Sequence, residues 1–303
     1  MNQFFELVLR NLRVYLRDKA AVFFSLLSML IVIMLMVFFI GDTNTTALTE
    51  LLSMLPGRDA DADRENAELL GLVWTCAGII SINAVTVTLS SLTSMIKDRT
   101  SGKINSIYTA PMSRLTIAAG YIFASWLSSV IICCATLAIT EAYCVFKGAD
   151  IFTPMVHMKL IGMIAVNSFT YASLMYVVAS LAGTEGAWSG LGTIIGTLVG
   201  FLGGIYMPIG SVDESIAAAM KCTPVIYGTV MFRKIMTADI LEKTFDNAPE
   251  EMMTEYASVM GIELEVMENS MTITDCLIIL ALCGIVFLTA GVIITQFVRK
   301  SDR

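Results

Sequence analysis

Polar side chains that could do chemistry are few in this sequence and lie far apart along the chain. Asn83 and Asn167 fall near the middle of long apolar segments, and Glu141 lies near the end of another. A polar or ionisable group inside a membrane is a functional candidate by default. The two asparagines are therefore candidates for a transport pathway, although such amides more often bridge helices. Glu141 is close to Lys147 and to an aqueous loop, so we expect it to be hydrated or paired.

Residues for catalysis or metal binding form no recognisable pattern. The one histidine, His157, has no companion ligand, and the seven cysteines show neither metal-ligand spacing nor a disulfide framework. The sequence has no Walker-type phosphate loop (GxxxxGK followed by Ser or Thr), so we expect no ATPase activity of its own. A formal net charge of -7 argues against a nucleic-acid partner, because such proteins carry basic patches.

The elements that must position these residues are six apolar segments. The chain is 56% hydrophobic and 15% charged, with a mean hydropathy of +0.76, which is too apolar for an ordinary soluble domain. A helix needs about 20 apolar residues to cross the hydrocarbon core of a bilayer. We expect six transmembrane helices within residues 20–303, at about 20–41, 69–96, 115–140, 160–184, 186–212 and 274–298. The acidic stretches 42–68 and 213–271 are expected to be external loops, and the fold class all-α.

Basic residues give the expected orientation, because Lys and Arg are retained on the cytoplasmic side of short loops. Three short segments hold eleven of the nineteen basic residues: Arg10, Arg13, Arg17 and Lys19; Lys97, Arg99, Lys103 and Arg114; and Arg299, Lys300 and Arg303. These segments precede the first span, separate the second from the third, and follow the last. We therefore expect a multi-pass protein of a bacterial inner membrane with both termini in the cytoplasm.

Residues 1–19 are expected to form an amphipathic helix at the cytoplasmic face of the membrane. One face carries apolar residues at helical spacing, namely Phe5, Leu9, Leu12 and Leu16, beside a stripe of arginines. Such a helix suits the membrane interface, where the arginines reach lipid phosphates. It is either a lever that touches a partner or, as we slightly favour, an anchor that fixes topology.

The segment between the second and third spans, KDRTSGKINSIYTAPMSR, carries the clearest local signal. Gly102 ends the preceding helix, Pro111 stops the following one, and the apolar residues between them fall at i, i+3 and i+4. The pattern predicts a short helix with one apolar face on the cytoplasmic side. Such a face either lies against lipid or docks into a protein groove, and the flanking basic residues favour docking.

Glycines mark the fifth span, and a proline marks its end. Gly192, Gly196, Gly200 and Gly204 repeat every four residues, a spacing that lets helices approach closely in lipid. The contact is either internal or a subunit interface, and the glycines do not distinguish these. Pro208 then breaks the span, and the apolar stretch from Val212 is expected to be a short re-entrant helix.

The cytoplasmic segment and the GIYMPI break resemble the type-2 ABC exporter permeases, the six-span membrane subunits of drug, antibiotic, lipid and polysaccharide exporters. The loop of that family runs acid-Arg-acid, then a glycine, an aliphatic residue and two apolar residues before Thr-Pro. The matching positions are Asp98, Arg99, Gly102, Ile104, Ile107, Tyr108 and Pro111. The sequence departs from the pattern at Thr100, which replaces the second acid, and at Ala110, which replaces the usual threonine.

The resemblance extends over essentially the whole chain and implies a coupling helix at about 100–110 that docks into a separate ABC ATPase subunit. ATP and Mg would be bound by that partner, and no cofactor by this chain. A homodimer, or a heterodimer with a paralogous permease, is also implied. Closure of two ATPase subunits would drive alternating access and move a hydrophobic or amphipathic substrate outward, whether a drug, antibiotic, lipid or peptide.

Two other classes of function remain open from the residues alone. An ion-coupled secondary transporter or channel would need intramembrane carboxylates or broken helices at the midplane, and the charge-free spans argue against it. A non-transporting membrane protein that acts as a scaffold or confers immunity is the other alternative. A Walker-type ATPase encoded beside this chain would favour the exporter.

Overall fold

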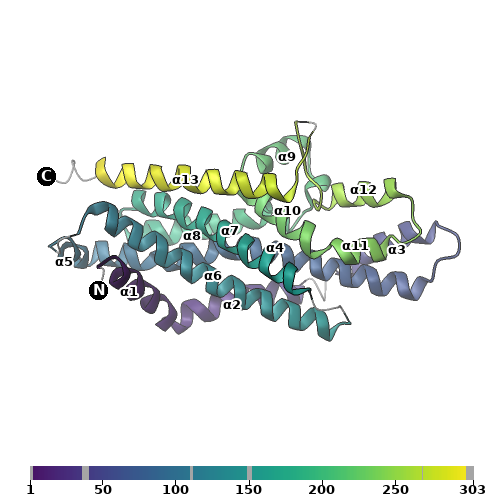
Figure 1. Ribbon diagram of the computed structural model, residues 1–303, viewed down its shortest axis with the longest axis horizontal. Coiled ribbons are helices and arrows are strands. Elements are labelled where there is room, and N and C mark those ends of the chain that lie inside the picture. The colour runs from purple at the N-terminus through teal and green to yellow at the C-terminus, as the bar shows by residue number, and fades with distance from the viewer. Residues whose placement is uncertain (1–2, 36–40, 110–111, 149–151, 268, 298–303) are drawn as a thin grey trace.

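The computed structural model describes residues 3–35, 41–109, 112–148, 152–267 and 269–297 of the chain. Within these ranges the chain is almost entirely helical and forms an elongated bundle (Figure 1). The expected all-α architecture is therefore confirmed. Pro111 and the basic residues after the last predicted span lie outside the described residues.

The elements follow one another as short surface helices and long bundle helices. Before and within the first half of the bundle they are α1 (Gln3–Arg17), α2 (Lys19–Leu35), α3 (Gly41–Ser53), α4 (Ala60–Thr100), α5 (Lys103–Thr109), α6 (Arg114–Phe146) and α7 (Pro154–Leu181). The remainder are α8 (Glu185–Leu202), the 3-10 turn η2 (Ile209–Ser211), α9 (Glu214–Lys221), α10 (Pro224–Met236), α11 (Ala238–Thr244), α12 (Glu250–Val259) and α13 (Ile273–Phe297). A two-residue antiparallel pair, β1 (Glu265–Val266) and β2 (Asn269–Ser270), precedes α13.

Helix α4 is the axis of the bundle, with α6, α7, α8 and α10 packed around it. Its 41 residues correspond to a rod of about 60 Å at a rise of 1.5 Å per residue. A helix that is apolar on all sides belongs in a core, and α4 buries apolar side chains from Leu70 to Ile96. On the opposite side of α7 from this axis, α13 completes the bundle (Figure 1).

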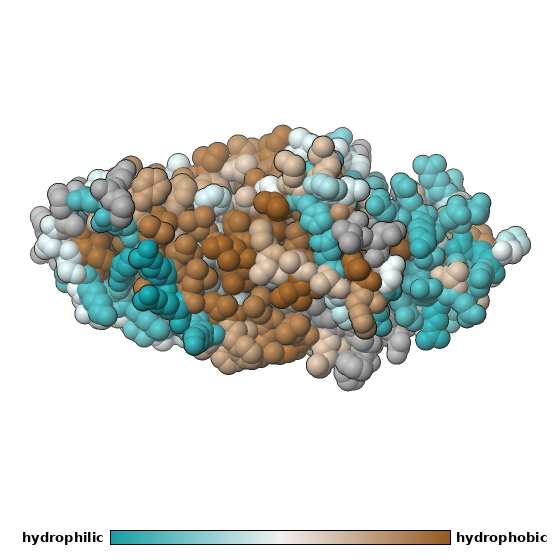
Figure 2. Space-filling model, turned by 60° about the horizontal axis from the view of Figure 1, so that its bottom comes forward, coloured by the Kyte–Doolittle hydropathy of each residue, from teal (hydrophilic) through white to brown (hydrophobic). Residues whose placement is uncertain are grey.

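Four helices among the described residues are long and apolar enough to cross a membrane, namely α4, α6, α7 and α13. The pair α9 and α10, bent by 89°, raises the number to five if it counts as one broken span. The expected spans at 20–41 and 186–212 correspond to α2 and α8, with 17 and 18 described residues respectively. The chain is thus a multi-pass membrane protein, and the count of six spans stays a prediction. Figure 2 shows a broad apolar belt between two hydrophilic ends.

One end of the molecule is a small helical cap with its own apolar core. Residues 42–68, expected as a loop, instead contain α3 and the first turns of α4, which pack on α11 and α12 through Leu48, Leu52, Ile240, Leu241, Phe245 and Ala257. Arg58 fastens these pieces, because its guanidinium donates to Asp63 Oδ2 at 2.8 Å and to the carbonyl of Thr244 at 2.8 Å. The ion pair with Asp63 raises the pKa of Arg58 above its ordinary value. An amphipathic surface helix carries many charges, which explains why the sequence resembles a loop here.

Candidate functional site

The end of the molecule opposite the cap contains α1, α5 and the ends of α4 and α7 (Figure 1). Helix α4 ends at Thr100 and Gly102 has a φ of +74°, a left-handed conformation that glycine adopts without strain. The chain then enters α5, which begins at Lys103. The predicted short helix therefore exists, and Gly102 has the turning role that its position indicated.

The apolar face of α5 turns toward the rest of the subunit. Ile104 is only 7% exposed, and Ile107 is half-buried against the main apolar core. The side chains on the exposed face are polar: Lys103, Asn105, Ser106 and Thr109. A partner that docks on α5 in this conformation therefore meets polar groups. The side chain of Tyr108 lies outside the described set, and its predicted contact with a partner stays a prediction.

Asp98, which is buried, lies in an ion pair with the partly exposed Arg10 and so helps to join three helices. Arg10 of α1 binds its carboxylate with both terminal nitrogens, at 2.6 and 2.8 Å, and the hydroxyl of Tyr121 from α6 donates to it at 2.8 Å. This bidentate geometry is the strong form of the guanidinium–carboxylate contact. Hydrogen bonding to Asp98 raises the pKa of Arg10 above its ordinary value. Asp98, one of the positions that match the family's coupling segment, is thus engaged inside the subunit, and its predicted role in coupling to a partner stays a prediction.

Helix α1 is held against α4 and α6 by a different face from the one expected to be apolar. Leu7 and Tyr15 are buried, whereas Phe5 and Leu9 are 58% and 40% exposed. Leu7 fits against Gly120 of α6, where a Cβ atom would lie 2.6 Å from Leu7 Cδ2. The exposed apolar residues are therefore free to lie in the membrane interface, and the predicted interfacial location of α1 stays a prediction.

The last turn of α4 also organises the connection between α7 and α8. Arg99 points a terminal nitrogen at the carbonyls of Ala179, Ser180 and Ala182, at 3.3 to 3.4 Å. A cation there satisfies carbonyls that the end of a helix leaves without partners. The next residue, Thr100, donates its hydroxyl to Glu185 Oε1 at 2.8 Å. The position that lacks the acid of the family pattern is thus in contact with a carboxylate from another helix.

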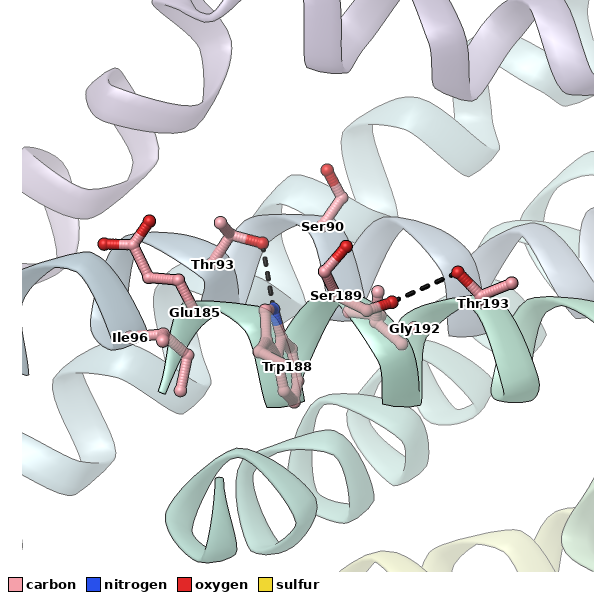
Figure 3. A pocket seen from close by; sticks show the side chains of 9 residues that line it. Ser90, Thr93, Ile96, Glu185, Trp188, Ser189, Gly192 and Thr193 are labelled. Atoms are coloured by element: carbon pink, nitrogen blue, oxygen red, sulfur yellow. Dashed lines mark hydrogen bonds between the residues drawn. The ribbon is translucent and has the colours of Figure 1, made fainter. Parts of the chain in front are cut away.

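A groove runs between α4 and α8 from this end of the bundle (Figure 3). Its volume is about 450 Å³, and its lining comprises Leu89, Ser90, Thr93 and Ile96 of α4 with Glu185, Trp188, Ser189, Gly192 and Thr193 of α8. The indole Nε1 of Trp188 donates to Thr93 Oγ1 at 3.0 Å and joins the two helices beneath the groove. Sequence reasoning identified only Gly192 among these lining residues.

The four regularly spaced glycines have different structural surroundings and roles. Gly192 contacts Leu89 of α4, and Gly200 lies against the ring of Tyr206. Gly204 lies beyond the end of α8 and has a φ of +65°, so it turns the chain. A Cβ atom at Gly196 would have no neighbour within 4 Å. Of the four, Gly196 alone leaves open space for another helix.

Asn83 and Asn167 bridge helices deep inside the subunit. Asn83 is 3% exposed and donates to Thr136 of α6 at 2.8 Å, while Asn167 is 1% exposed and donates to the Ser81 carbonyl of α4 at 3.2 Å. Neither side chain lines the groove between α4 and α8. Their proposed place in a pathway therefore stays a prediction. Both amides bridge helices, although the buried Oδ1 of Asn167 has no hydrogen-bond partner among the described residues.

Glu141 is paired, although not with the residue expected. His157 Nε2 lies 2.7 Å from Glu141 Oε2, and the backbone amide of Phe152 donates to Glu141 Oε1 at 3.1 Å. The hydrogen bond to Glu141 raises the pKa of His157 above its ordinary value. The single histidine, which the sequence gave no reason to select, thus fastens the turn between α6 and α7.

Arg233 is a candidate residue that no pattern in the sequence indicated. It is 0% exposed, has no carboxylate partner among the described residues, and stacks on Trp74 with 3.8 Å between its guanidinium carbon and the ring centre. It donates to the carbonyls of Gly204 at 2.8 Å and Met260 at 3.3 Å. One side chain of α10 thereby ties α4, the end of α8 and the cap together.

These features define an α-helical, multi-pass membrane protein whose two polar ends differ in architecture. Comparison with protein families places the chain more narrowly. The model of the ABC-2 family transporter proteins matches residues 60–293, which span α4 to most of α13, and the chain belongs to this family. No curated protein compared with the chain matches it. It is accordingly a permease of an ABC transporter, a class that works with a separate ABC ATPase subunit.

Family membership favours the ABC permease over the two other classes considered from the residues. Family members are transport subunits that generally lack an ATPase motif, in keeping with the absent phosphate loop. The matched range begins after α1 and α2, so the ion pair of Arg10 with Asp98 joins a segment outside the match to one inside it.

Proposed function

We propose that this chain is the permease of an ABC exporter in a bacterial inner membrane, with the α5 end in the cytoplasm. The charge distribution supports this orientation, because basic residues gather before α2 and around α5 whereas the cap is acidic. A second permease, identical or paralogous, would complete the transporter. Two ATPase subunits would bind ATP and Mg and drive movement of a hydrophobic or amphipathic substrate outward.

Helix α5, which follows α4 at the end where basic residues gather, is the observation that carries this proposal, and the substrate pathway is proposed to be the groove between α4 and α8. This groove adjoins α5 through Thr100 and Glu185, whose side chains are hydrogen-bonded at 2.8 Å. Along the groove and just beyond it, α8 exposes Ser189, Thr193 and Thr197, one helical turn apart. Small and hydroxyl residues are those through which membrane helices pack. A second permease covering this stripe would enclose the two grooves between the subunits.

Docking of the ATPase is proposed to occur on the exposed polar face of α5. Only two residues, Ser101 and Gly102, separate the end of α4 from the seven-residue helix α5. A displacement of α5 by a partner is therefore transmitted to α4. The ion pair of Arg10 and Asp98 makes α1 part of the same assembly. Contact with the partner would then displace the ends of α1 and α4 together.

The decisive experiment places a bulky charge on that face. Ser106→Arg, at an exposed position of α5, is expected to reduce co-purification of the ATPase encoded beside this chain, and its transport-coupled turnover, at least tenfold. Ser258→Arg, at an exposed position of α12 in the cap, is the matched control and is expected to change neither. Unchanged association in the Ser106 variant, or labelling of Lys103 from outside the cell, would overturn the proposal.

A further inference from the structure

The groove between α4 and α8 contains one charge, and its surroundings leave that charge without a counter-ion. Glu185 is the single ionisable residue among the nine that line the groove. It is exposed and accepts one hydrogen bond, from Thr100, at Oε1. Within the described part of the chain it forms no ion pair. Arg99 is near in sequence to Thr100, but its guanidinium is directed at the carbonyls of α7.

The rest of the lining supplies an apolar wall and neutral hydrogen-bonding groups. The apolar part comprises Leu89, which is half-buried, above a floor formed by Ile96 and Trp188, which are only 1% and 3% exposed. The orientation of Trp188 is fixed by its hydrogen bond to Thr93. Glu185 and Trp188 are three residues apart and so lie on the same side of α8. In Figure 3 Glu185 lies at one end of the row of lining residues, with Thr193 at the other.

The size and the charge of the groove together select a class of ligand. Binding sites for small molecules have volumes of about 300–1,000 Å³ and are mostly apolar with a few placed polar groups, and this groove has about 450 Å³. An exposed carboxylate without a counter-ion attracts organic cations. No Lys or Arg lines the groove to balance an anion. An anionic head group would therefore meet only repulsion from Glu185.

We infer that the groove binds an amphipathic organic cation, with its ammonium or phosphonium charge at Glu185 and its apolar body along Trp188, Leu89 and Ile96. This inference rests on the proposed function, because it names the substrate class of the same groove. The hydroxyls of Ser90 and Ser189 complete the polar side of the site. The cation is held at the end of the groove nearest α5, where a substrate from the cytoplasm would enter.

The test measures binding by the full chain without its ATPase. The chain is reconstituted in phosphatidylcholine vesicles, and binding of radiolabelled tetraphenylphosphonium is measured by equilibrium dialysis, with protein-free vesicles subtracted. Glu185→Gln keeps the shape of the side chain and removes the charge, so we expect the Kd for this cation to rise at least tenfold. The neutral analogue triphenylphosphine oxide should bind both proteins with the same affinity. Glu250→Gln, which removes an exposed acid of the cap, should leave both affinities unchanged.

Three results would overturn the inference. Unchanged affinity of Glu185→Gln for the cation would show that the charge does not recognise it. Equal loss for the cation and the neutral analogue would show that the substitution disturbs the groove as a whole. In a separate co-purification, loss of the ATPase from the Glu185→Gln chain would make Glu185 a subunit contact. In each of these cases the proposed exporter function would survive, because it is tested separately on α5.

Discussion

Arg233 offers the sharpest test of how the cap is joined to the bundle. Its two hydrogen bonds to the carbonyls of Gly204 and Met260 come from a charged donor, and such bonds contribute about 1.5–3 kcal/mol each. Stacking on Trp74 adds about 2 kcal/mol in a dry environment. Replacement by alanine removes all of this, but it also relieves a desolvation cost of several kcal/mol for the buried cation. We expect Arg233→Ala to lower the free energy of unfolding by about 3 kcal/mol.

Lysine should not rescue this position. An ammonium group carries the same charge, yet it cannot span two carbonyls as the planar guanidinium does. Arg233→Lys is therefore expected to lose at least half as much stability as Arg233→Ala. Arg64→Ala is the control, because Arg64 forms an exposed pair with Glu68 on the surface of the same cap, and exposed pairs contribute about 0–1 kcal/mol.

The measurement can use the protein's own thiols. Cys76, Cys133, Cys144 and Cys276 are buried and free, so a maleimide dye that fluoresces on reaction reports unfolding as the detergent-solubilised protein is heated. Cys222 is exposed and would be changed to serine in every variant. A loss of 3 kcal/mol corresponds to a fall in Tm of about 5 °C for a chain of 303 residues. A fall in Arg233→Ala no larger than that of the Arg64 control would refute the reasoning.

Two further predictions concern the other ion pairs. The two ring nitrogens of His157 lie 2.7 Å from Glu141 and 3.1 Å from the Thr153 carbonyl. Two acceptors favour the protonated imidazolium, so the folded-state pKa of His157 is raised. The contact therefore stabilises the fold fully below the unfolded-state pKa of about 6.5, and this stabilisation is lost as pH rises through the folded-state pKa. The Tm difference between wild type and His157→Gln should thus shrink from pH 6 to pH 9, and a constant difference would contradict an ionic role. For Arg10 and Asp98, a double-mutant cycle of Arg10→Met and Asp98→Asn should show a coupling energy of about 1 kcal/mol or more, whereas additive effects would mean that α1 is held by packing alone.

The long helices could be located from segments without charged residues. The length of such a segment is set by the thickness of the bilayer and not by contacts with particular residues elsewhere in the chain. The predicted spans at 69–96 and 115–140 lie within α4 and α6. The predicted span at 274–298 ends one residue after the last residue of α13. Gly102 could also be assigned its turn, since a left-handed residue at a helix end is a local requirement. Short-range rules of this kind need no knowledge of the tertiary structure.

Contacts between distant segments could not be read from the sequence. Arg10 and Asp98 are 88 residues apart, and nothing local distinguishes Arg10 from the other arginines of α1. The spacing of residues 5, 9, 12 and 16 predicted one apolar face on α1. In the structure α1 instead packs against α4 and α6 through Leu7 and Tyr15. Arg233 occurs in a stretch that resembles a solvated loop. Arg233 can be buried because the fold brings the carbonyls of Gly204 and Met260, which are distant in sequence, close to its guanidinium.

The length of α4 links these separate sites physically. It contains no proline, the usual cause of a sharp kink, and it carries Trp74 near the cap, the groove residues Ser90 and Thr93, and Asp98 at its end. About 36 Å of helix separates Trp74 from Asp98 at 1.5 Å per residue. Because Arg233 fixes one region of this rod and Arg10 fixes the other, a displacement of α5 must rotate or tilt α4 as a whole or break one of these contacts. Any such movement carries the α4 wall of the groove past α8, so the groove changes shape whenever α5 moves.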